Sequence, residues 1–417
     1  MCFSVSSSAR AASSDPATSI DELLSGLGAL VAELEPGLIA FRRDVHAHPE
    51  LAHEETRTTT RIAEVLAEAG IAFTTLRGTG LLVDLGAARP TRRVALRADL
   101  DALPLTERSG LPFASSWPGV SHACGHDVHT TVLLGAALAL ARVEAELEAR
   151  GLAVRCIFQP AEEVFPGGAE AVIEQGALDG VDVVYALHCD PTLEVGRVGL
   201  RVGPITAASD HLEVRLRGAG GHTSRPHLTQ DLTYALAKVV TDVPASLSRR
   251  VDPRSVVALV WGKISAGDAA NVIPETGVAL GTVRCLDAEV WDAIGPLLQE
   301  LVHAAAAPFG VAVEVNHERG VPPVVNDAAA VASLRSGITA TLGAEAVAPT
   351  PQSLGGEDFS WMTRHVPGAL ARLGTKTPGG PSYDLHRPDL VVDERAIGVG
   401  VSTFVGAALQ ALLVPAP

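Results

Sequence analysis

The amino-acid sequence predicts an α/β protein in which a mostly parallel sheet flanked by helices is interrupted by a smaller α+β unit. Apolar β-rich segments alternate with helical segments over most of the chain, which is typical of parallel sheets covered on both faces. A central region instead shows period-two alternation with turn residues. At 417 residues and 47% apolar composition, the chain is also long enough for two separate cores.

The N-terminal part is expected to form a leader and two helices. The segment "MCFSVSSSARAASSDPATS" has no continuous apolar stretch, so residues 1–18 are expected to be a disordered leader rather than a signal peptide. The next pattern predicts a helix after Ser19, a suitable N-cap, with Asp21 and Glu22 in its first turn. A second helix is predicted over "EETRTTTRIAEVLAEAG".

Three β-rich segments follow, and a change of texture near Gly203 marks the inserted unit. The segments are "RRVALRADLDALP", "LAVRCIFQPAEE" and "VDVVYALHCDP", with a helix predicted from Thr130 to about Ala149 between the first two. Beyond Gly203, alternating segments flank helical stretches around 232–247 and 288–307. We therefore predict an inserted α+β domain over residues 205–317 and a main domain over 19–204 and 318–417.

The composition favours a small-molecule ligand over a large charged partner. The formal net charge is −16 and no Lys/Arg block occurs, so the chain should repel nucleic-acid phosphates and anionic lipid. No apolar stretch reaches membrane-spanning length without a charge or a helix breaker. The five cysteines are irregularly spaced, which fits reduced thiols. We therefore expect a cytoplasmic protein with no nucleic-acid or membrane partner.

Ionisable side chains follow three of the predicted strands at the point where each strand ends. In an open α/β sheet, sites form beyond the carboxyl ends of the strands. These groups should therefore meet at one edge of the sheet. They are Asp99, Asp101, Glu162, Glu163 and His188.

The segment "VSHACGHDVHTT" adds further metal-ligating residue types to this edge. Because it precedes the helix expected near Thr130, it should hold Cys124, His126 and Asp127 in a loop above the sheet. Thiolate, imidazole and carboxylate together suit Zn²⁺, with Mn²⁺, Co²⁺ or Ni²⁺ as alternatives, and argue against the oxygen-seeking Ca²⁺ and Mg²⁺. The sequence has no Cys-x-x-Cys pair of a structural zinc site, so we predict coordination that stays open to water.

The adjacent Glu162 and Glu163 suggest one ligand and one base. Neighbouring side chains of an extended segment point in opposite directions, so one carboxylate is expected to hold metal while the other faces the cleft. A carboxylate beside a metal-bound water would act as a general base, because the metal lowers the pKa of the water toward ~7.

A series of motifs resembles the two-metal aminoacylase and carboxypeptidase family. The motifs "RRDVHAHPEL", "LRADLDALP", "HACGHDVHTT", "QPAEE", "ALH", "GGHTSRPH", "NVIP", "GTVR", "GGEDF" and "LHRPD" follow in the family's order from Phe41 onward. The similarity is greatest to the amidohydrolase branch, which contains hippurate hydrolase and the indole-acetyl-amino-acid hydrolases. The combination is highly specific, whereas "QPAEE" or "NVIP" alone is weak.

The resemblance implies a fold, a reaction and a ligand set. It implies a catalytic α/β domain interrupted by a smaller domain that pairs with its copy in a homodimer, which agrees with the insertion predicted above. It implies hydrolysis of the amide bond of an N-acyl amino acid or related conjugate by a metal-bridging water that Glu162 activates. The implied ligands of two divalent ions, with zinc as the first choice, are Cys124, His126, Glu163, His188 and His386.

The resemblance also implies roles for three residues of the inserted domain. His222 would reach the neighbouring subunit's cleft and stabilise the oxyanion of the reaction. Asn271 and Arg284 would hold the substrate, with Arg284 binding its carboxylate.

One departure from the wider family concerns the segment Asp99-Leu100-Asp101. Many members have a His-x-Asp pair here, and in this chain the ligand role passes to Cys124 and His126, as in the amidohydrolase branch. We therefore expect the remaining acids and histidines of these motifs to order ligands or loops rather than bind metal. They are Asp99, Asp101, Asp127, His46, His48, His122 and His129.

Three other functions compete with the amidohydrolase interpretation. The first is a metallo-carboxypeptidase or dipeptidase acting on short peptides. The second is a thiol hydrolase with Cys124 as nucleophile, which gives no reason for strands to bring acids to the cleft. The third is a non-catalytic protein that binds an acyl amino acid and needs no base at Glu162. Glu357 and Asp358 are expected to shape the substrate pocket or to cap the next helix.

Overall fold

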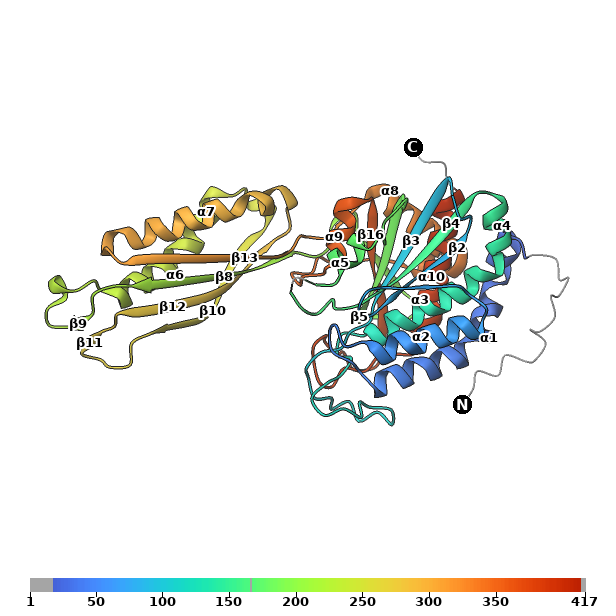
Figure 1. The fold of residues 1–417 in the computed structure, drawn as a ribbon, viewed down its shortest axis with the longest axis horizontal. Helices are drawn as coiled ribbons and strands as arrows, with labels where there is room; N and C mark the ends of the chain where they lie inside the picture. The colour runs from blue at the N-terminus through green and yellow to red at the C-terminus, as the bar shows by residue number, and fades with distance from the viewer. Residues whose placement is uncertain (1–17, 166, 414–417) are drawn as a thin grey trace. The chain divides into compact units, whose positions relative to one another are not determined.

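The computed structural model describes residues 18–165 and 167–413, and these residues form two compact units (Figure 1). Unit 1 takes its residues from Met1–Gly203, Asn326–Pro351 and Trp361–Pro417, whereas unit 2 comprises Pro204–Val325 and Gln352–Ser360. Each unit has its own buried apolar core. The expected leader, residues 1–18, lies outside the described residues apart from Thr18.

The described residues of unit 1 contain an eight-stranded sheet in the order β1-β2-β4-β3-β5-β16-β6-β15. Its central strands β4, β3, β5 and β16 run parallel, whereas β1–β2, β2–β4 and β16–β6 are antiparallel pairs. The prediction of a mostly parallel sheet flanked by helices is therefore confirmed. The strands are β1 (Thr74–Thr75), β2 (Leu81–Gly86), β3 (Arg92–Asp99), β4 (Leu152–Gln159), β5 (Val183–Glu194), β6 (Val198–Leu200), β15 (Val347–Pro349) and β16 (Gly368–Lys376).

Helices cover this sheet and bury its apolar side chains. Helices α3 and α10 pack against β3 and β5, and α1 packs on both helices from outside. The helices are α1 (Ile20–Ala47), α2 (Thr56–Glu68), α3 (His126–Leu140), α4 (Glu144–Ala149), α5 (Ala169–Glu174), α8 (Ala328–Leu342), α9 (Phe359–His365) and α10 (Ala396–Leu413).

The first helix begins as the sequence predicts. The Ser19 hydroxyl accepts a hydrogen bond from the Glu22 amide, and the Glu22 carboxylate accepts one from the Ser19 amide. This reciprocal capping box satisfies two amides that the helix itself leaves unpaired, and a cap of this kind stabilises a helix by about 1 kcal/mol.

The predicted start of α3 was wrong. The helix begins at His126 rather than near Thr130, so His126 and Asp127 lie in its first turn and not in a loop. Gly125 precedes the helix with a φ of 90°, a left-handed conformation that glycine adopts without strain. The Asp127 carboxylate then lies where the helix dipole favours negative charge.

Within the described residues, three helical segments are long and apolar enough to cross a membrane, judged by length and composition alone. They are Ile20–Ala47, His126–Ala149 and Ala396–Leu413. Ala396–Leu413 contains no charged residue, and glycines are the only helix-breaking residues in it. Burial accounts for the apolar character of two of them, because 72% and 78% of the apolar windows in His126–Ala149 and Ala396–Leu413 are buried in the protein.

The described part of unit 2 is built on a four-stranded antiparallel sheet in the order β10-β12-β8-β13. Helices α6 and α7 contact each other and pack on one face of it (Figure 1). Strand β13 continues past residue 317 because Val321 still pairs with Ser209. The elements are β8 (Ala208–Arg217), β9 (Gly221–His222), α6 (Leu232–Arg250), β10 (Val257–Ala266), β11 (Val272–Ile273), β12 (Thr276–Cys285), α7 (Ala288–Ala306) and β13 (Ala312–Val321).

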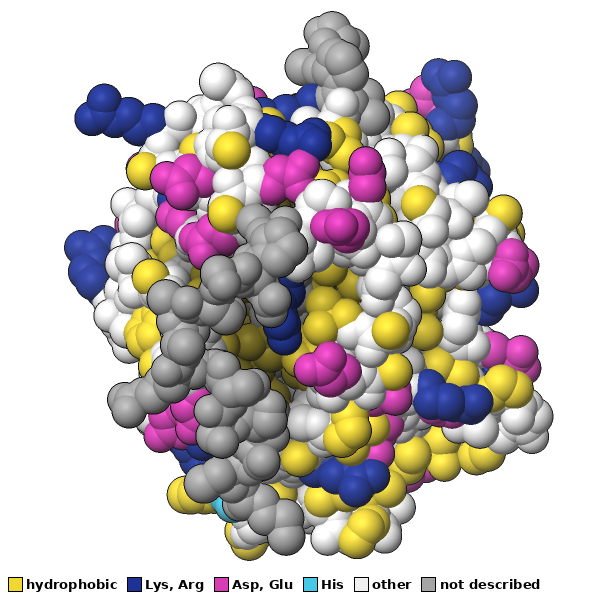
Figure 2. All heavy atoms as spheres, turned by 90° about the vertical axis from the view of Figure 1, so that its right-hand side faces the viewer, with side chains coloured by type: hydrophobic (Ala, Val, Ile, Leu, Met, Phe, Trp, Pro, Cys, Tyr) yellow, Lys and Arg dark blue, Asp and Glu magenta, His cyan; other side chains and the backbone are white. Residues whose placement is uncertain are grey.

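Two short strands pair where the chain passes between the units. They are β7 (Gly203–Pro204) and β14 (Val325–Asn326). Figure 2 shows one face of the molecule, on whose described part side chains of both charges are scattered among apolar and neutral ones. No block of one charge stands out on that part of the face, in keeping with the absence of a Lys/Arg block from the sequence.

Candidate metal centre

Five side chains that the family resemblance implies as metal ligands lie together in unit 1. Cys124, His126 and His188 each place a possible ligand atom within 4.8 Å of the others, and so do Cys124, Glu163 and His386. The two groups share Cys124 and bring together the loop before α3, the first turn of α3, the turn after β4, strand β5 and the segment before α10. Residues far apart in the chain therefore converge on one small volume.

His188 is held in the form that binds metal. Its Nδ1 donates a hydrogen bond of 2.8 Å to the Cys189 carbonyl, which leaves Nε2 facing the Cys124 sulfur at 3.5 Å. Burial, together with the charge of Arg372, lowers the pKa of His188 well below its usual value. The ring is therefore neutral at pH 7, and a neutral imidazole is what a metal ion requires.

The ring of His126 faces carboxylates with both of its nitrogens. Its Nδ1 donates to Asp101 Oδ1 at 3.3 Å, whereas Nε2 lies 3.7 Å from Glu163 Oε1 and 4.0 Å from Glu162 Oε2. Among the described residues, this buried Nε2 has no hydrogen-bond partner. The distances are too long for hydrogen bonds, and the gap leaves room for metal–ligand bonds of about 2.0–2.2 Å at this nitrogen. The residues present therefore fit a divalent metal.

Asp101 orients two of these ligands at once. One carboxylate oxygen accepts from His126 Nδ1, and the other accepts from the Glu163 amide at 2.8 Å. Asp101 itself is fully buried. Asp101 therefore contacts one proposed ligand through its ring and another through its backbone.

Asp99 orders a different part of the centre. It accepts a 2.6 Å hydrogen bond from Nδ1 of His129 and a 2.7 Å one from Arg97. Nε2 of His129 in turn accepts from the Cys189 amide at 2.8 Å. Although Asp99, His126 and His129 are close enough for a third group, both nitrogens of His129 are already used in hydrogen bonds.

Asp127 is tied to α1. It accepts a 2.6 Å hydrogen bond from Arg42 and a 2.8 Å one from Nδ1 of His46, whose Nε2 contacts Glu107 at 3.1 Å. This buried network fixes the first turn of α3, which carries His126. Arg42 and Glu107 had no predicted role, and the place of Arg42 in the motif "RRDVHAHPEL" was the only signal for it.

The expectation that Glu162 and Glu163 point in opposite directions was wrong. Each places a carboxylate oxygen within 4.8 Å of the same His126 nitrogen. The segment after β4 is not extended, because Ala161 has a left-handed φ of 59°. This turn directs both carboxylates toward the cluster.

The remaining predicted residues lie in unit 2. His222 is exposed and pairs with Val272 of β11, next to Asn271, whose carbonyl accepts from the Thr223 amide. Half-buried Arg284 lies in β12, and its side chain alternates with those that face α6 and α7. Glu357 accepts a 3.0 Å hydrogen bond from the Phe359 amide, at the start of α9.

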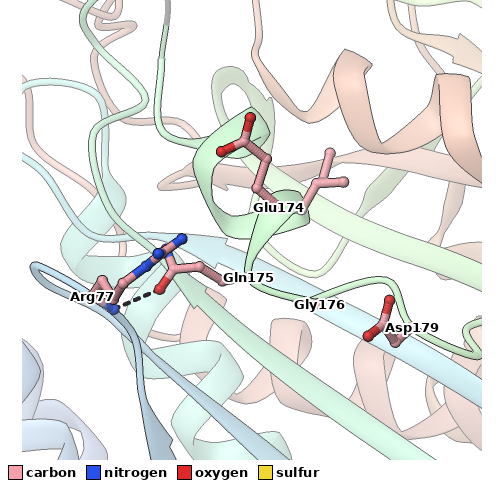
Figure 3. Close-up of a pocket in the computed structure, with 6 residues that line it drawn as sticks. Arg77, Glu174, Gln175, Gly176 and Asp179 are labelled. Atoms are coloured by element: carbon pink, nitrogen blue, oxygen red, sulfur yellow. Dashed lines mark hydrogen bonds between the residues drawn. The ribbon is translucent and has the colours of Figure 1, made fainter.

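A separate hollow of about 530 Å³ lies at the end of α5 (Figure 3). The Gln175 side chain accepts a 2.6 Å hydrogen bond from the Arg77 amide there. None of the predicted site residues lines it, and its lining contains no histidine or cysteine. The lining residues are Arg77, Ile173, Glu174, Gln175, Gly176 and Asp179.

Comparison with known proteins connects this geometry to a family. The model of peptidase family M20/M25/M40 matches residues 95–410. The solved structure of a dinuclear metal binding peptidase of the M20 family from Bacillus subtilis has a TM-score of 0.79 and 33% identity, covering 91% of this chain and 99% of that one.

Two relatives are similar over most of the chain. The N-acetyl-L-cysteine deacetylase of Bacillus subtilis is 39% identical over 385 residues, which are 92% of this chain and 90% of the relative. A Rhodococcus jostii protein named "Putative glutamate--cysteine ligase 2-3" is 49% identical over 372 residues, or 89% of this chain. The match spans only 46% of the length of that second relative.

Proposed function

Because the chain belongs to peptidase family M20/M25/M40, we propose that it is a metal-dependent amidohydrolase that cleaves N-acyl amino acids. The observation that carries this proposal is the convergence of Cys124, His126, Glu163, His188 and His386, with Glu162 beside them. The relative that deacetylates N-acetyl-L-cysteine supports the substrate class.

We propose that two divalent ions are held there, zinc in the first place and manganese, cobalt or nickel as alternatives. Bound cations would supply Lewis acidity and lower the pKa of water at the site. Cys124, His126 and His188 would form one ligand group, and Cys124, Glu163 and His386 the other. Asp101 would keep His126 and Glu163 oriented through its two hydrogen bonds.

Glu162 is the proposed general base. Its carboxylate lies 4.0 Å from His126 Nε2 and is mostly buried, so it can reach a water molecule between itself and the ligand cluster. It would take the proton of the attacking water and pass it to the amide nitrogen as the C–N bond breaks. This assignment leaves Glu163 as the ligand, which its place beside Cys124 and His386 supports.

The thiol-hydrolase alternative is disfavoured by the surroundings of Cys124. Burial and the nearby Glu163 carboxylate raise the pKa of the Cys124 thiol well above its usual value. A nucleophilic cysteine needs a lowered pKa instead. Cleavage of short peptides stays as the second candidate, because the similar solved structure is described as a peptidase.

We further propose a homodimer formed through unit 2. In the described chain, β10 and β13 are the edges of the four-stranded sheet. Exposed Val260 and Ile264 lie on β10, whereas β13 presents Glu314, Asn316 and Glu318. Charged edges resist pairing and apolar edges favour it, so β10 is the proposed contact.

His222 is proposed to stabilise the oxyanion in the partner's site. Its Nδ1 accepts a hydrogen bond from the Ser224 amide at 3.1 Å, so the exposed Nε2 is the nitrogen that can donate. Asn271 and Arg284 are proposed to hold the substrate. A cytoplasmic location is also proposed, since the cysteines among the described residues are unpaired thiols.

The test is a hydrolysis screen joined to metal analysis. Purified protein is analysed for bound metal and assayed against N-acetyl, N-benzoyl and indole-acetyl amino acids and dipeptides, with and without chelator. We expect release of free amino acid that stops after chelation and returns with Zn²⁺ or Mn²⁺. Glu162→Gln should retain metal and lose about 10²–10⁴-fold in kcat. Activity that survives complete metal removal would contradict the proposed function.

A further inference from the structure

The turn that carries Glu162 and Glu163 has a conformation that its own sequence does not favour. Ala161, the residue before the pair, is fully buried and has a φ of 59°. A residue with a Cβ rarely adopts this left-handed conformation, because the Cβ crowds the backbone. Since no glycine stands at this position, surrounding groups must hold the backbone in place.

Glu55, at the start of α2, provides such a contact. Its Oε1 accepts a 2.8 Å hydrogen bond from the Ala161 amide, and its Oε2 accepts a 2.6 Å one from the Thr79 hydroxyl. Glu55 is fully buried and Thr79 is nearly so. A carboxylate is expensive to bury unless hydrogen bonds compensate, so this pair of donors accounts for its presence inside the protein.

Backbone encloses the turn on its other sides. The Gly168 amide donates to the Ala161 carbonyl at 2.7 Å. A Cβ at Gly168 would lie 2.0 Å from the Pro160 carbonyl oxygen, and a Cβ at Gly80 would lie 2.4 Å from that of Phe158. Both glycines therefore permit a close approach that leaves the turn little room to relax.

Two buried carboxylates thus accept hydrogen bonds from the backbone on either side of Glu162. Glu55 accepts from the amide before it, at Ala161, and Asp101 accepts from the amide after it, at Glu163. Asp101 also contacts His126, whereas the Glu55 side chain accepts its hydrogen bonds from Ala161 and Thr79, neither of which is a proposed ligand. The two carboxylates therefore act on different parts of the centre.

We propose that Glu55 is a positioning residue that sets the direction of the Glu162 side chain by holding Ala161 in its left-handed conformation. This inference rests on the proposed function, in which Glu162 is the base. Loss of Glu55 should misdirect the base while the ligands still hold metal, because Asp101 continues to fix His126 and Glu163. The signature is a fall in kcat without an equal fall in metal content.

The test uses the full chain loaded with Zn²⁺ and the N-acyl amino acid that the wild type cleaves fastest. Glu55→Leu removes both acceptors at similar volume and should lower kcat tenfold or more, with KM within threefold and bound zinc unchanged. Glu55→Gln keeps an acceptor for the Ala161 amide, so its kcat should stay within about threefold. The exposed neighbour offers the matched control Glu54→Gln, which should match the wild type.

The inference is overturned if the kcat of Glu55→Leu stays within twofold of the wild type, or if its loss of zinc accounts for its loss of activity. It is also overturned if the kcat of Glu55→Gln falls as much as that of Glu55→Leu. If Glu55→Leu does not fold, the test uses Thr79→Val, which removes the hydroxyl that donates to Glu55. A kcat reduced threefold or more at full zinc content supports the inference, and an unchanged kcat overturns it. Wild-type turnover and inactive Glu162→Gln, measured alongside, keep the proposed function separate from these outcomes.

Discussion

The two sheets of the molecule place polar side chains in opposite ways. In unit 1, Asp99 at the end of β3 and His188, which lies within β5 rather than at its end as the sequence predicted, are buried in hydrogen-bond networks. In unit 2, the sheet face away from α6 and α7 bears open polar groups around a hollow of about 540 Å³, among them His211, Glu213 and Lys263. Buried, hydrogen-bonded groups are preorganised for chemistry, whereas an exposed face suits contacts with other molecules.

The largest expected difference between the units concerns one buried thiol in each. Cys124→Ser replaces the residue shared by both ligand groups and should lower zinc content and reduce kcat/KM by ~10³-fold or more. Cys285→Ser, in β12, should leave both near wild type, because a hydroxyl can still accept from the Asp287 amide. Zinc content by elemental analysis and turnover check the pair. Equal zinc loss in both variants would contradict the assignment of Cys124 as a metal ligand.

A second test asks whether unit 2 takes part in the chemistry. His222→Gln should lower kcat by about 10²-fold, as expected for one lost oxyanion donor, while zinc content stays at the wild-type level. His211→Gln, at another exposed histidine of unit 2, serves as the control and should be silent. Steady-state kinetics at saturating substrate separate the two variants. If both match the wild type, the oxyanion role of His222 is wrong.

A third test disrupts the proposed contact between subunits. The double variant Val260→Lys, Ile264→Lys should prevent the β10 edges of two subunits from pairing. The mass measured by light scattering should then be half that of the wild type. If His222 acts on the partner's site, the activity of this variant should fall as well. The fall should be smaller than that of His222→Gln if part of the variant protein is still dimeric. Glu314→Lys on β13 should leave the mass unchanged. A wild-type protein that is monomeric at micromolar concentration would refute the dimer.

Local signals made much of the fold predictable. The Ser19 cap and the alternating segments led to α1 and to the strands β3, β4 and β5, and the structure contains all four. The proposed ligands were named from the ordered motifs, and the structure brings all five together. Propensity and spacing were sufficient for the helix and the strands because each of these signals lies within one element, whereas the ligand set was implied by the family resemblance.

Contacts between distant segments were not predictable in the same way. Nothing in the sequence near Ala161 signals a left-handed turn, because the Glu55 carboxylate that holds its amide comes from 106 positions earlier in the chain. The start of α3 was missed because the apolar run that predicts the helix begins only after Thr131, whereas its first turn is polar. A glycine directly before His126 and Asp127 was the signal that could have corrected this prediction.

The smallest expected effect compares a buried carboxylate of unit 1 with an exposed one of unit 2. Burial alone would raise the pKa of Glu107, but hydrogen bonds from His46, Ser109 and the Ser115 amide lower it to about 2. A depressed pKa means that the folded protein binds this proton less readily than the unfolded chain. Its stabilising contribution is therefore complete above about pH 4.5 and is lost as the pH falls toward 2.

Glu107→Gln should accordingly flatten the fall of the unfolding temperature between pH 4.5 and 2, measured by thermal melts followed by circular dichroism. Glu300→Gln removes an exposed carboxylate that pairs with Arg250 in unit 2. Since exposed ion pairs contribute little to stability, this variant should follow the wild-type pH dependence. A Glu107→Gln curve as steep as the wild type would mean that the buried network of His46 contributes no more to acid stability than the surface pair does.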